Sequence, residues 1–390
     1  MFNRKFSSNI RRKKRMITSI IILLVVSLGI GYSAISTNLS INGNLQVKRY
    51  EEKIYWALQD NDNDSVNETL VLSSEEVTGK EQGSFPVSTS FSDASQVPWI
   101  ADSYYSTSNK SYNVTTVNIE KEISPTSTSY WFNGVGYNAS TFTANLENLN
   151  TSQVTDMSNM FDSSGSNAAA WNIGDLSDWD TSQVTNMSSM FNSAGYSATT
   201  FNLNLSNWNT SRVTNMRYMF ENTGYSATTW AIGDLSGWNT SQVTDMRGMF
   251  CGLGHTSTTF NIGDLSGWNT SKVTNMNGMF MNAGYSTTTF DIGNISNWNT
   301  SQVTDMSYMF ASAGRNATIF NLNLSGCDTS QVTNMSNMFY YAGYAATTFS
   351  ITIPRTNGNG INNDTTHMYG STTSTYAEPP SSRTFTVAAS

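Results

Sequence analysis

The sequence is poor in the residues that build catalytic, metal-binding and disulfide-stabilised sites. Its 390 residues include 2 cysteines, 2 histidines and 6 prolines. Cys251 and Cys327 are too few for a disulfide framework, and we expect both to be reduced. His255 and His367 lie far apart in unlike contexts, and no nucleophile–base pair, metal-ligand cluster or phosphate-binding glycine loop accompanies them. The sequence therefore predicts that the chain is not an enzyme and uses no metal or other cofactor.

Basic residues are scarce outside the N-terminus. Seven of the 20 lysines and arginines lie in the first fifteen positions, which leaves 13 for the rest of the chain against 28 acidic residues. Because nucleic-acid binding requires a basic patch, this balance argues against nucleic acid as a partner. An acidic exterior rich in Ser, Thr and Asn fits a secreted surface.

The N-terminal basic cluster precedes an apolar run from Ile17 to about Ile35. A run of this kind is either a cleaved signal peptide or a retained signal anchor, and its length is close to that of a bilayer span. Both alternatives stay open. In both, the positive flank stays inside and the rest of the chain lies outside the cytoplasm. We therefore expect residues 1–35 to contact the membrane, and the protein to be secreted or anchored at the cell surface.

An eleven-residue repeat phrase, Thr-Ser-x-Val-Thr-(Asp/Asn)-Met-x-x-Met-Phe, occurs seven times in steps of 29 or 30 residues. A fixed period of this size is typical of a solenoid, in which each coil buries its apolar side against its neighbours. The copies begin at Thr151, Thr181, Thr210, Thr240, Thr270, Thr300 and Thr329.

One unit indicates the structure of a coil. Residues 201–205 alternate between apolar and polar, which is strand geometry. Val213, Met216 and Met219 are three apart, which favours a short helical or 3₁₀ turn that Asn215 could cap. The sequence therefore predicts a β-rich solenoid of the leucine-rich-repeat type, with one short strand and one short helical turn per coil of about 30 residues.

Four columns of identical residues are predicted to form the core. A methionine column at this spacing is far more often core than a metal or cofactor site, because methionine fills irregular gaps and packs well against aromatic rings. The columns begin at Met157, Met160, Phe161 and Trp179 and recur in the following coils.

The rest of the chain is divided around the array. We expect residues 127–354 to form about eight coils, including a degenerate first coil. Residues 36–126 are predicted to form a small N-terminal β cap, with a hairpin of two strands at 53–58 and 69–72. Residues 355–390 are expected to form a polar C-terminal tail or cap.

The longer phrase Trp-(Asn/Asp)-Thr-Ser-x-Val-Thr-(Asp/Asn)-Met-x-x-Met-Phe closely resembles the repeat of the BspA-like leucine-rich-repeat surface proteins of bacteria. The resemblance extends from Tyr130 to Phe349. It implies a cell-surface solenoid that adheres to host proteins, host cells or other bacteria, and it implies no catalytic residues. This chain departs from the family's shorter unit by an insert of the Gly-Tyr-Ser-Ala-Thr-Thr type after each Met-Phe, so no particular ligand is carried over.

Two polar stripes are candidate binding surfaces. The first follows the glycine after each Met-Phe, and tyrosine there offers a large contact area with a polar tip. Its alternative interpretation, a ladder packed over the edge of the solenoid, stays open. Its candidate ligand-binding residues are Tyr196, Tyr225, Tyr285, Tyr344, His255 and Arg315. The second stripe is the outward strand face, for which simple solubility is the alternative: Asn172, Asp175, Asn202, Asn204, Asp234, Asn261, Asp264, Asp291, Asn321 and Asn323.

Calcium binding is weighed against these surfaces, because it needs several convergent oxygen ligands. The column that contains Asn215 alternates between Asp and Asn, which are interchangeable as caps but not as calcium ligands. The denser run at 60–64 is expected to be a solvated turn.

Two functions follow from the sequence. The first is an adhesin whose equivalent shallow sites gain avidity by repetition, with a host extracellular protein, a glycan or another bacterial surface as partner. The second is a passive structural stalk or coat component.

Overall fold

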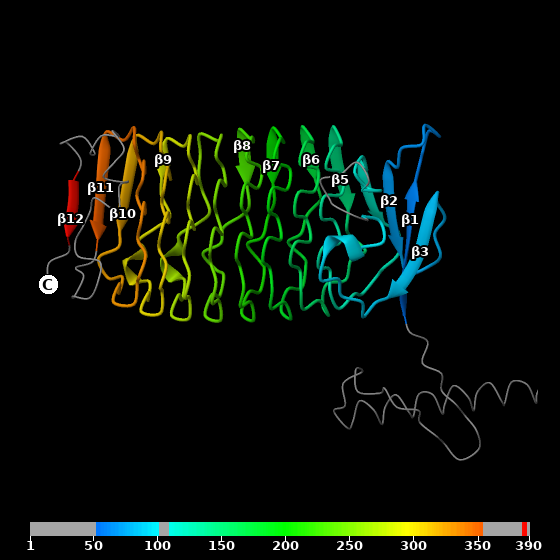
Figure 1. Ribbon diagram of the computed structural model, residues 1–390, viewed down its shortest axis with the longest axis horizontal. Coiled ribbons are helices and arrows are strands. Elements are labelled where there is room, and N and C mark those ends of the chain that lie inside the picture. Colours follow the sequence, from blue (N-terminus) through cyan, green and yellow to red (C-terminus); the bar gives the residue numbers. More distant parts are fainter. Residues whose placement is uncertain (1–51, 101–108, 354–383, 388–390) are drawn as a thin grey trace, which may run out of the picture. The chain divides into compact units, whose positions relative to one another are not determined.

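The computed structural model describes residues 52–100, 109–353 and 384–387. These residues belong to one compact unit, Glu52–Ser390. The predicted β-rich solenoid is confirmed, with about eight coils stacked in chain order (Figure 1). Within the described part of the chain, no helix has the length and hydropathy needed to cross a bilayer. The expected N-terminal membrane segment, residues 1–35, lies outside the described residues.

The N-terminal cap is a three-stranded antiparallel sheet. The predicted hairpin is present as β1 (Lys53–Gln59) and β2 (Thr69–Ser73). A third strand, β3 (Glu81–Pro86), pairs with the other edge of β1 and was not predicted. Its sequence, Glu-Gln-Gly-Ser-Phe-Pro, buries only Phe85, so it carries almost no alternating pattern.

The cap continues directly into the solenoid. Strand β2 pairs in parallel with β4 (Thr116–Ile119). Strand β4 pairs with β5 (Thr141–Asn145), and β5 pairs with β6 (Ala170–Asn172). The parallel ladder therefore starts before the boundary expected at position 127. The start of the ladder could not be predicted from the repeat, because residues 109–126 contain no copy of the repeat phrase.

The later coils add further parallel strands on the same side of the coil. Strands β7 (Thr200–Asn202) and β8 (Thr229–Ala231) form one pair. The last sheet runs in the order β12-β11-β10-β9 and includes residues 384–387, which belong to the segment predicted only as a polar tail or cap. Its strands are β9 (Thr289–Phe290), β10 (Ile319–Asn323), β11 (Thr348–Ile353) and β12 (Thr384–Val387).

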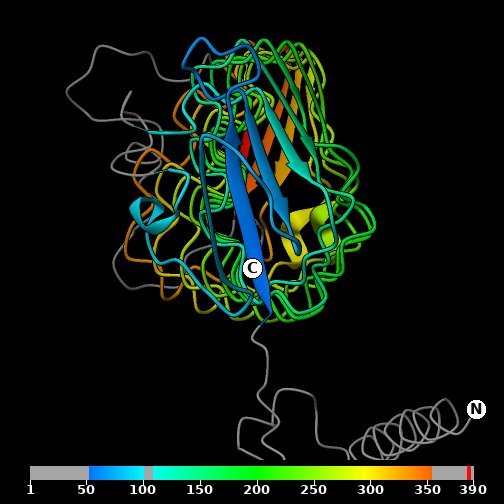
Figure 2. The ribbon, with the colours of Figure 1, turned by 90° about the vertical axis from the view of Figure 1, so that its right-hand side faces the viewer.

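A second parallel ladder crosses the repeat phrases. Single bridges join Ser127 to Asp156 and continue through the capping column of every coil to Asn334. Seen along the stack in Figure 2, successive coils lie over one another. The solenoid is therefore held by backbone hydrogen bonds on two sides of each coil.

The short helical turn predicted at the methionine columns is wrong. The N–H groups of Met216, Tyr218 and Phe220 donate to carbonyls of the next coil, at 2.8–3.1 Å. The alternate N–H group of Met219 donates within its own coil, to Met216. Tyr218 and Asn222 have positive φ (56° and 53°), a conformation that cannot continue a right-handed helix. The spacing of three between the methionines therefore comes from a series of tight turns, which alternate with hydrogen bonds to the next coil.

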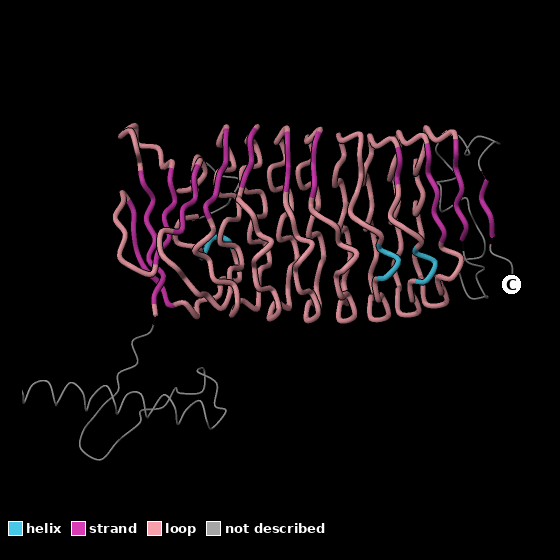
Figure 3. The backbone as a smooth tube through the Cα atoms, turned by 180° about the vertical axis from the view of Figure 1, so that it is seen from behind, coloured by secondary structure: helices cyan, strands magenta, loops and turns pink. Residues whose placement is uncertain are grey.

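The helical turns that do occur are short 3₁₀ segments elsewhere. One lies before the solenoid, η2 (Ala94–Gln96). Two follow the strand positions of consecutive coils, η3 (Leu265–Gly267) and η4 (Ile295–Asn297), and are drawn in cyan in Figure 3. Side chains of Asp264 and Asn294 cap these two turns.

The four predicted columns form the core. The Met and Phe columns are at most 5 % exposed, and the Trp column at most 9 %. Phe rings of neighbouring coils stack at 5.3–5.8 Å, as Phe191 does on Phe220. The indole N–H of Trp238 donates to the Leu205 carbonyl of the preceding coil, at 3.0 Å. Cys327 takes the Trp position in its coil, and both cysteines are free and buried, as predicted.

Buried threonine hydroxyls also join the coils, and one provides a test of this linkage. Thr210 is 1 % exposed, and its hydroxyl donates to the Asn239 carbonyl of the next coil at 3.1 Å. We expect Thr210→Val to lower the free energy of unfolding by about 1 kcal/mol, because this part-buried hydrogen bond between coils is lost while the side-chain volume is kept. Urea denaturation measures the change. Thr210→Ser keeps the hydroxyl and serves as control, and an equal loss in both variants would contradict the hydrogen-bond explanation.

Candidate functional site

The six candidate residues form one continuous stack on an edge of the solenoid, here called the aromatic ladder (Tyr196, Tyr225, His255, Tyr285, Arg315 and Tyr344). Ring centroids are 4.8 Å apart between Tyr196 and Tyr225, 4.1 Å between Tyr225 and His255, and 4.4 Å between His255 and Tyr285. The interplanar angles of these pairs are 4°, 16° and 22°, so the rings lie nearly face to face. The sequence-predicted column is therefore a physical cluster.

Backbone bonds set the spacing of the ladder. The carbonyl of Tyr196 accepts from the Ser226 N–H of the next coil at 2.9 Å. The carbonyl of Tyr285 accepts from the Asn316 N–H in the same way, at 2.9 Å. Because each ladder residue is tied to the coil that follows, the rings lie one coil apart, which is close to the distance of aromatic stacking.

The C-terminal end of the ladder is a cation–π cluster. The Arg315 guanidinium carbon lies 5.5 Å from the ring centroid of Tyr285, 4.1 Å from Tyr341 and 5.3 Å from Tyr344. Tyr344 is 50 % exposed, whereas the preceding five ladder residues are half-buried. Tyr341 was not predicted as part of this cluster, because it lies three residues before the ladder column in the sequence, yet its ring contacts Arg315 and Tyr344.

The ladder is electrically neutral except at Arg315. Burial lowers the pKa of His255, so its imidazole is uncharged at neutral pH and stacks as a neutral ring. Burial, followed by the neighbouring Tyr196 and Tyr285, raises the pKa of Tyr225. The exposed parts of these stacked rings are their edges and polar tips, because the faces pack on one another.

A single coil interrupts the column. Ser166 occupies the ladder position there and is 7 % exposed. On its other side Tyr137 stacks on Tyr112 at 5.6 Å. The ladder proper therefore begins at Tyr196, and serine at this position is compatible with the coil.

The chain matches one known protein family. A family model described as "Mycoplasma protein of unknown function, DUF285" matches residues 105–230, 196–287 and 255–378. Together these overlapping matches cover well over half of the chain. The chain belongs to the DUF285 family. No curated protein and no solved structure gives a match.

In the second predicted stripe of this DUF285 protein, most side chains accept hydrogen bonds from nearby backbone N–H groups. Asp175, Asp234 and Asp264 each accept a hydrogen bond from the N–H of the residue two positions later, at 2.9 Å. Asn172, Asn204, Asn261, Asp291 and Asn323 form the same Asx turns, at 2.9–3.3 Å. These bonds explain why Asp and Asn recur there.

A partly buried column of mixed residues, polar in its first coils, was not predicted and lies beside the core. It occupies the position after the phenylalanine of each coil and contains Asn133, Asp162, Asn192, Glu221 and Cys251, followed by Met281, Ala311 and Tyr340. Ser163 donates to Asp162 at 2.8 Å, and Asn192 donates to Glu221 at 2.9 Å. Burial raises the pKa of Asp162 to about 7 and also raises that of Glu221. Burial, then Glu221, raises the pKa of the Cys251 thiol to about 12, so the thiol stays protonated.

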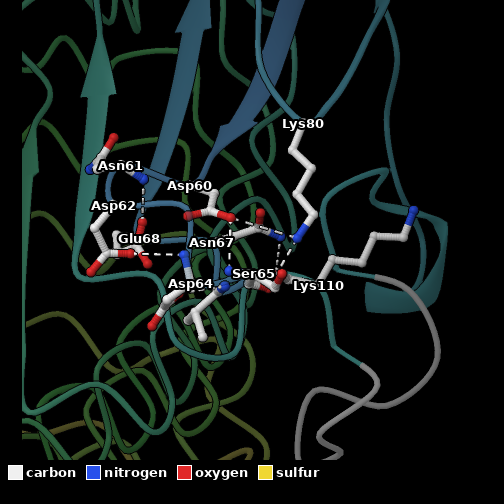
Figure 4. Close-up of polar contacts among 10 residues, drawn as sticks. Asp60, Asn61, Asp62, Asp64, Ser65, Asn67, Glu68, Lys80 and Lys110 are labelled. Atoms are coloured by element: carbon white, nitrogen blue, oxygen red, sulfur yellow. Dashed lines mark hydrogen bonds and ion pairs between the residues drawn. The ribbon is translucent and has the colours of Figure 1, made fainter.

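The acidic turn between β1 and β2 is shown in Figure 4. Each of Asp60, Asp62, Asp64 and Glu68 offers an oxygen within 4.8 Å of the others, the one such group of acids among the described residues. Most of this geometry is explained within the turn. Asp60 accepts from the Ser65 N–H at 2.9 Å and lies 3.8 Å from Lys80, and Glu68 accepts from the Asn61 N–H at 2.6 Å. The carboxylates thus cap the turn's own backbone.

Proposed function

We propose that this DUF285 protein is a bacterial cell-surface protein that binds an extracellular protein, a glycan or another bacterial surface through the aromatic ladder, without catalysis. The observation that supports this best is the ladder itself, a continuous row of half-buried or exposed aromatic and cationic side chains along one edge. Tyrosine and arginine are enriched at recognition surfaces. Repetition along the edge would offer equivalent shallow contacts that gain avidity.

The N-terminal sequence supports a surface location. Seven basic residues followed by an apolar run at 17–35 are typical of an export signal or a signal anchor. The resemblance of the repeat phrase to that of the BspA-like leucine-rich-repeat proteins supports the same location and an adhesive role.

A passive stalk or coat component is the second candidate, and one observation favours it. The ring faces of the ladder pack on one another, as between Tyr225 and His255 at 4.1 Å. Such stacking would rigidify the solenoid even if nothing bound to its edge.

Binding by the full-length chain in detergent micelles separates the two candidates. We expect saturable binding to at least one member of a panel of matrix proteins, glycans and bacterial surfaces. The triple variant Y196S/Y225S/Y285S should reduce this binding at least tenfold, because it removes three rings from the ladder. It should still fold, since Ser166 already occupies the same position in another coil.

The matched control is Tyr218→Ser, which removes a tyrosine from a different column. Melting curves of all variants establish that they are folded. Absence of saturable binding, or binding that the triple variant leaves intact, would support the stalk instead.

A further inference from the structure

The few basic side chains of the solenoid are unevenly placed. Among residues 127–353, lysine and arginine occur five times, and four of the five lie in the repeat phrases of three consecutive coils. The other repeat phrases contain none. These three phrases include a single acidic residue, Asp245. We call this surface the basic face, and its residues are Arg212, Arg217, Arg247 and Lys272.

The fold brings the four residues to one side of the stack. Arg212 and Lys272 occupy the third position of their phrases, and Arg217 and Arg247 follow the first methionine of theirs. The bridges from Asn215 through Asp245 to Asn275 hold the three phrases side by side. With about 4.8 Å between neighbouring strands, the basic face extends over about 10 Å along the stack.

Two of the four charges of the basic face, those of Arg212 and Lys272, have neutral side-chain partners. Arg212 and Lys272 are exposed and donate to neutral glutamines of the preceding coils, Gln183 and Gln242. Arg217 is also exposed, and its guanidinium lies 4.7 Å from the ring of Tyr218.

The charge of Arg217 offsets part of the rise in the pKa of the neighbouring Glu221 carboxyl, whereas Arg247 has a carboxylate within ion-pair distance. Its Nη2 lies 3.9 Å from Asp245, and its Nε is buried without a hydrogen-bond partner. In the part of the chain that the structure describes, none of the other three forms an ion pair within 4.0 Å. Three positive charges are therefore held in place and facing solvent on an acidic protein.

We propose that the basic face binds a linear anionic polysaccharide through the sulfate or carboxylate groups along its chain. Guanidinium groups form bidentate hydrogen bonds with such anions, and the lysine ammonium adds a further positive charge. Between the two basic columns lies a row of exposed hydroxyls, those of Thr214, Thr244 and Thr274. They already donate to the preceding coil, which leaves their lone pairs to accept bonds from sugar hydroxyls.

A polysaccharide fits this surface better than a nucleic acid does. The face holds only four basic groups, and the whole chain has a formal net charge of −8, which opposes the high charge density of a duplex. The proposal rests on the proposed function only in requiring that the solenoid meet extracellular glycans. It does not require the aromatic ladder to bind anything.

The test uses the full-length chain in nonionic detergent and size-defined heparin oligosaccharides on a biosensor, at 50 to 300 mM salt. Hyaluronate, which carries carboxylates and no sulfates, distinguishes the two anion types. The variant is R212Q/R217S/R247S/K272Q. Each replacement residue already occupies the same column in another coil, as Gln183 and Ser188 do, so the variant should fold.

We expect the quadruple variant to bind at least tenfold more weakly and to lose most of the salt dependence. The double variant R217S/R247S should lose part of the affinity, whereas the charge-matched control K53Q/K121Q in the cap region should lose none. The ladder variant Y196S/Y225S/Y285S should bind heparin normally, which keeps this test separate from that of the ladder. The proposal is overturned if the quadruple variant binds like wild type, if wild type binds neither glycan at 50 mM salt, or if duplex DNA binds as tightly as heparin.

Discussion

Replacing Gly224 by alanine is expected to lower the free energy of unfolding by about 2–5 kcal/mol. Gly224 has φ +53°, and a Cβ placed there would lie 2.7 Å from both Cβ and Cγ of Phe201, a fully buried ring. The left-handed conformation costs alanine about 1–2 kcal/mol. Moving a packed ring adds about 1–3 kcal/mol. A glycine with positive φ stands at this position in every coil, from Gly136 to Gly343.

A second glycine tests the explanation. Gly237 has no atom within 4 Å of an added Cβ and no positive φ, so Gly237→Ala should leave stability unchanged or raise it by a few tenths of a kcal/mol. Thermal and urea unfolding of both variants measure the difference. Equal midpoints for the two alanine variants would show that the glycine column is not set by the contact with the aromatic ring.

The stacking of coils could be predicted because the repeat reports it directly. A residue that recurs every 29 or 30 positions must occupy the same place in successive coils, so identical apolar residues stack into a core. Met216, Phe220 and Trp208 illustrate this, since each is at most 3 % exposed. The capping role of Asn215 was also visible, and its side chain accepts from the Arg217 N–H at 3.0 Å.

The local conformation of the turn could not be predicted in the same way. A spacing of three between methionines is shared by a helix and by the series of turns observed here. The two differ in the partners of alternate N–H groups, which lie in the next coil and about 30 residues away in sequence. Positive φ at Tyr218 could not be foreseen either, because a bulky side chain rarely adopts that conformation. Contacts between coils stabilise it.

The candidate surfaces also divide into features that the repeat predicts and features that depend on contacts between coils. The ladder column followed from the register of the repeat, but the stacking of Tyr225 on His255 needed the coil spacing. Asp162 and Glu221 escaped notice because each differs from the residues at the same position in its neighbours and so interrupts a column instead of forming one. A polar residue at a fixed position beside a core phenylalanine was the available signal.

Raising the pH from 4 to 8 is expected to destabilise the folded protein through Asp162. Burial raises the pKa of this carboxyl from 3.8 to about 7, with Ser163 and Asn133 offsetting part of the effect and Glu221 adding to it. The folded state then binds more protons than the unfolded state between these values. The free energy of unfolding therefore falls as pH rises through this window, by up to about 4 kcal/mol. The raised pKa of Glu221 acts in the same direction.

Asp162→Asn should remove most of this dependence. Asparagine occupies the same position in the flanking coils, at Asn133 and Asn192, so the variant should pack normally. We expect it to match wild type at pH 4 and to be several kcal/mol more stable at pH 8, as measured by urea unfolding at each pH. Asp175→Asn is the control with the opposite sign, because hydrogen bonds from Ser177 lower the pKa of Asp175 and its contribution is lost as pH falls. If wild type and Asp162→Asn changed in parallel from pH 4 to 8, the buried carboxyl would not be the group that titrates.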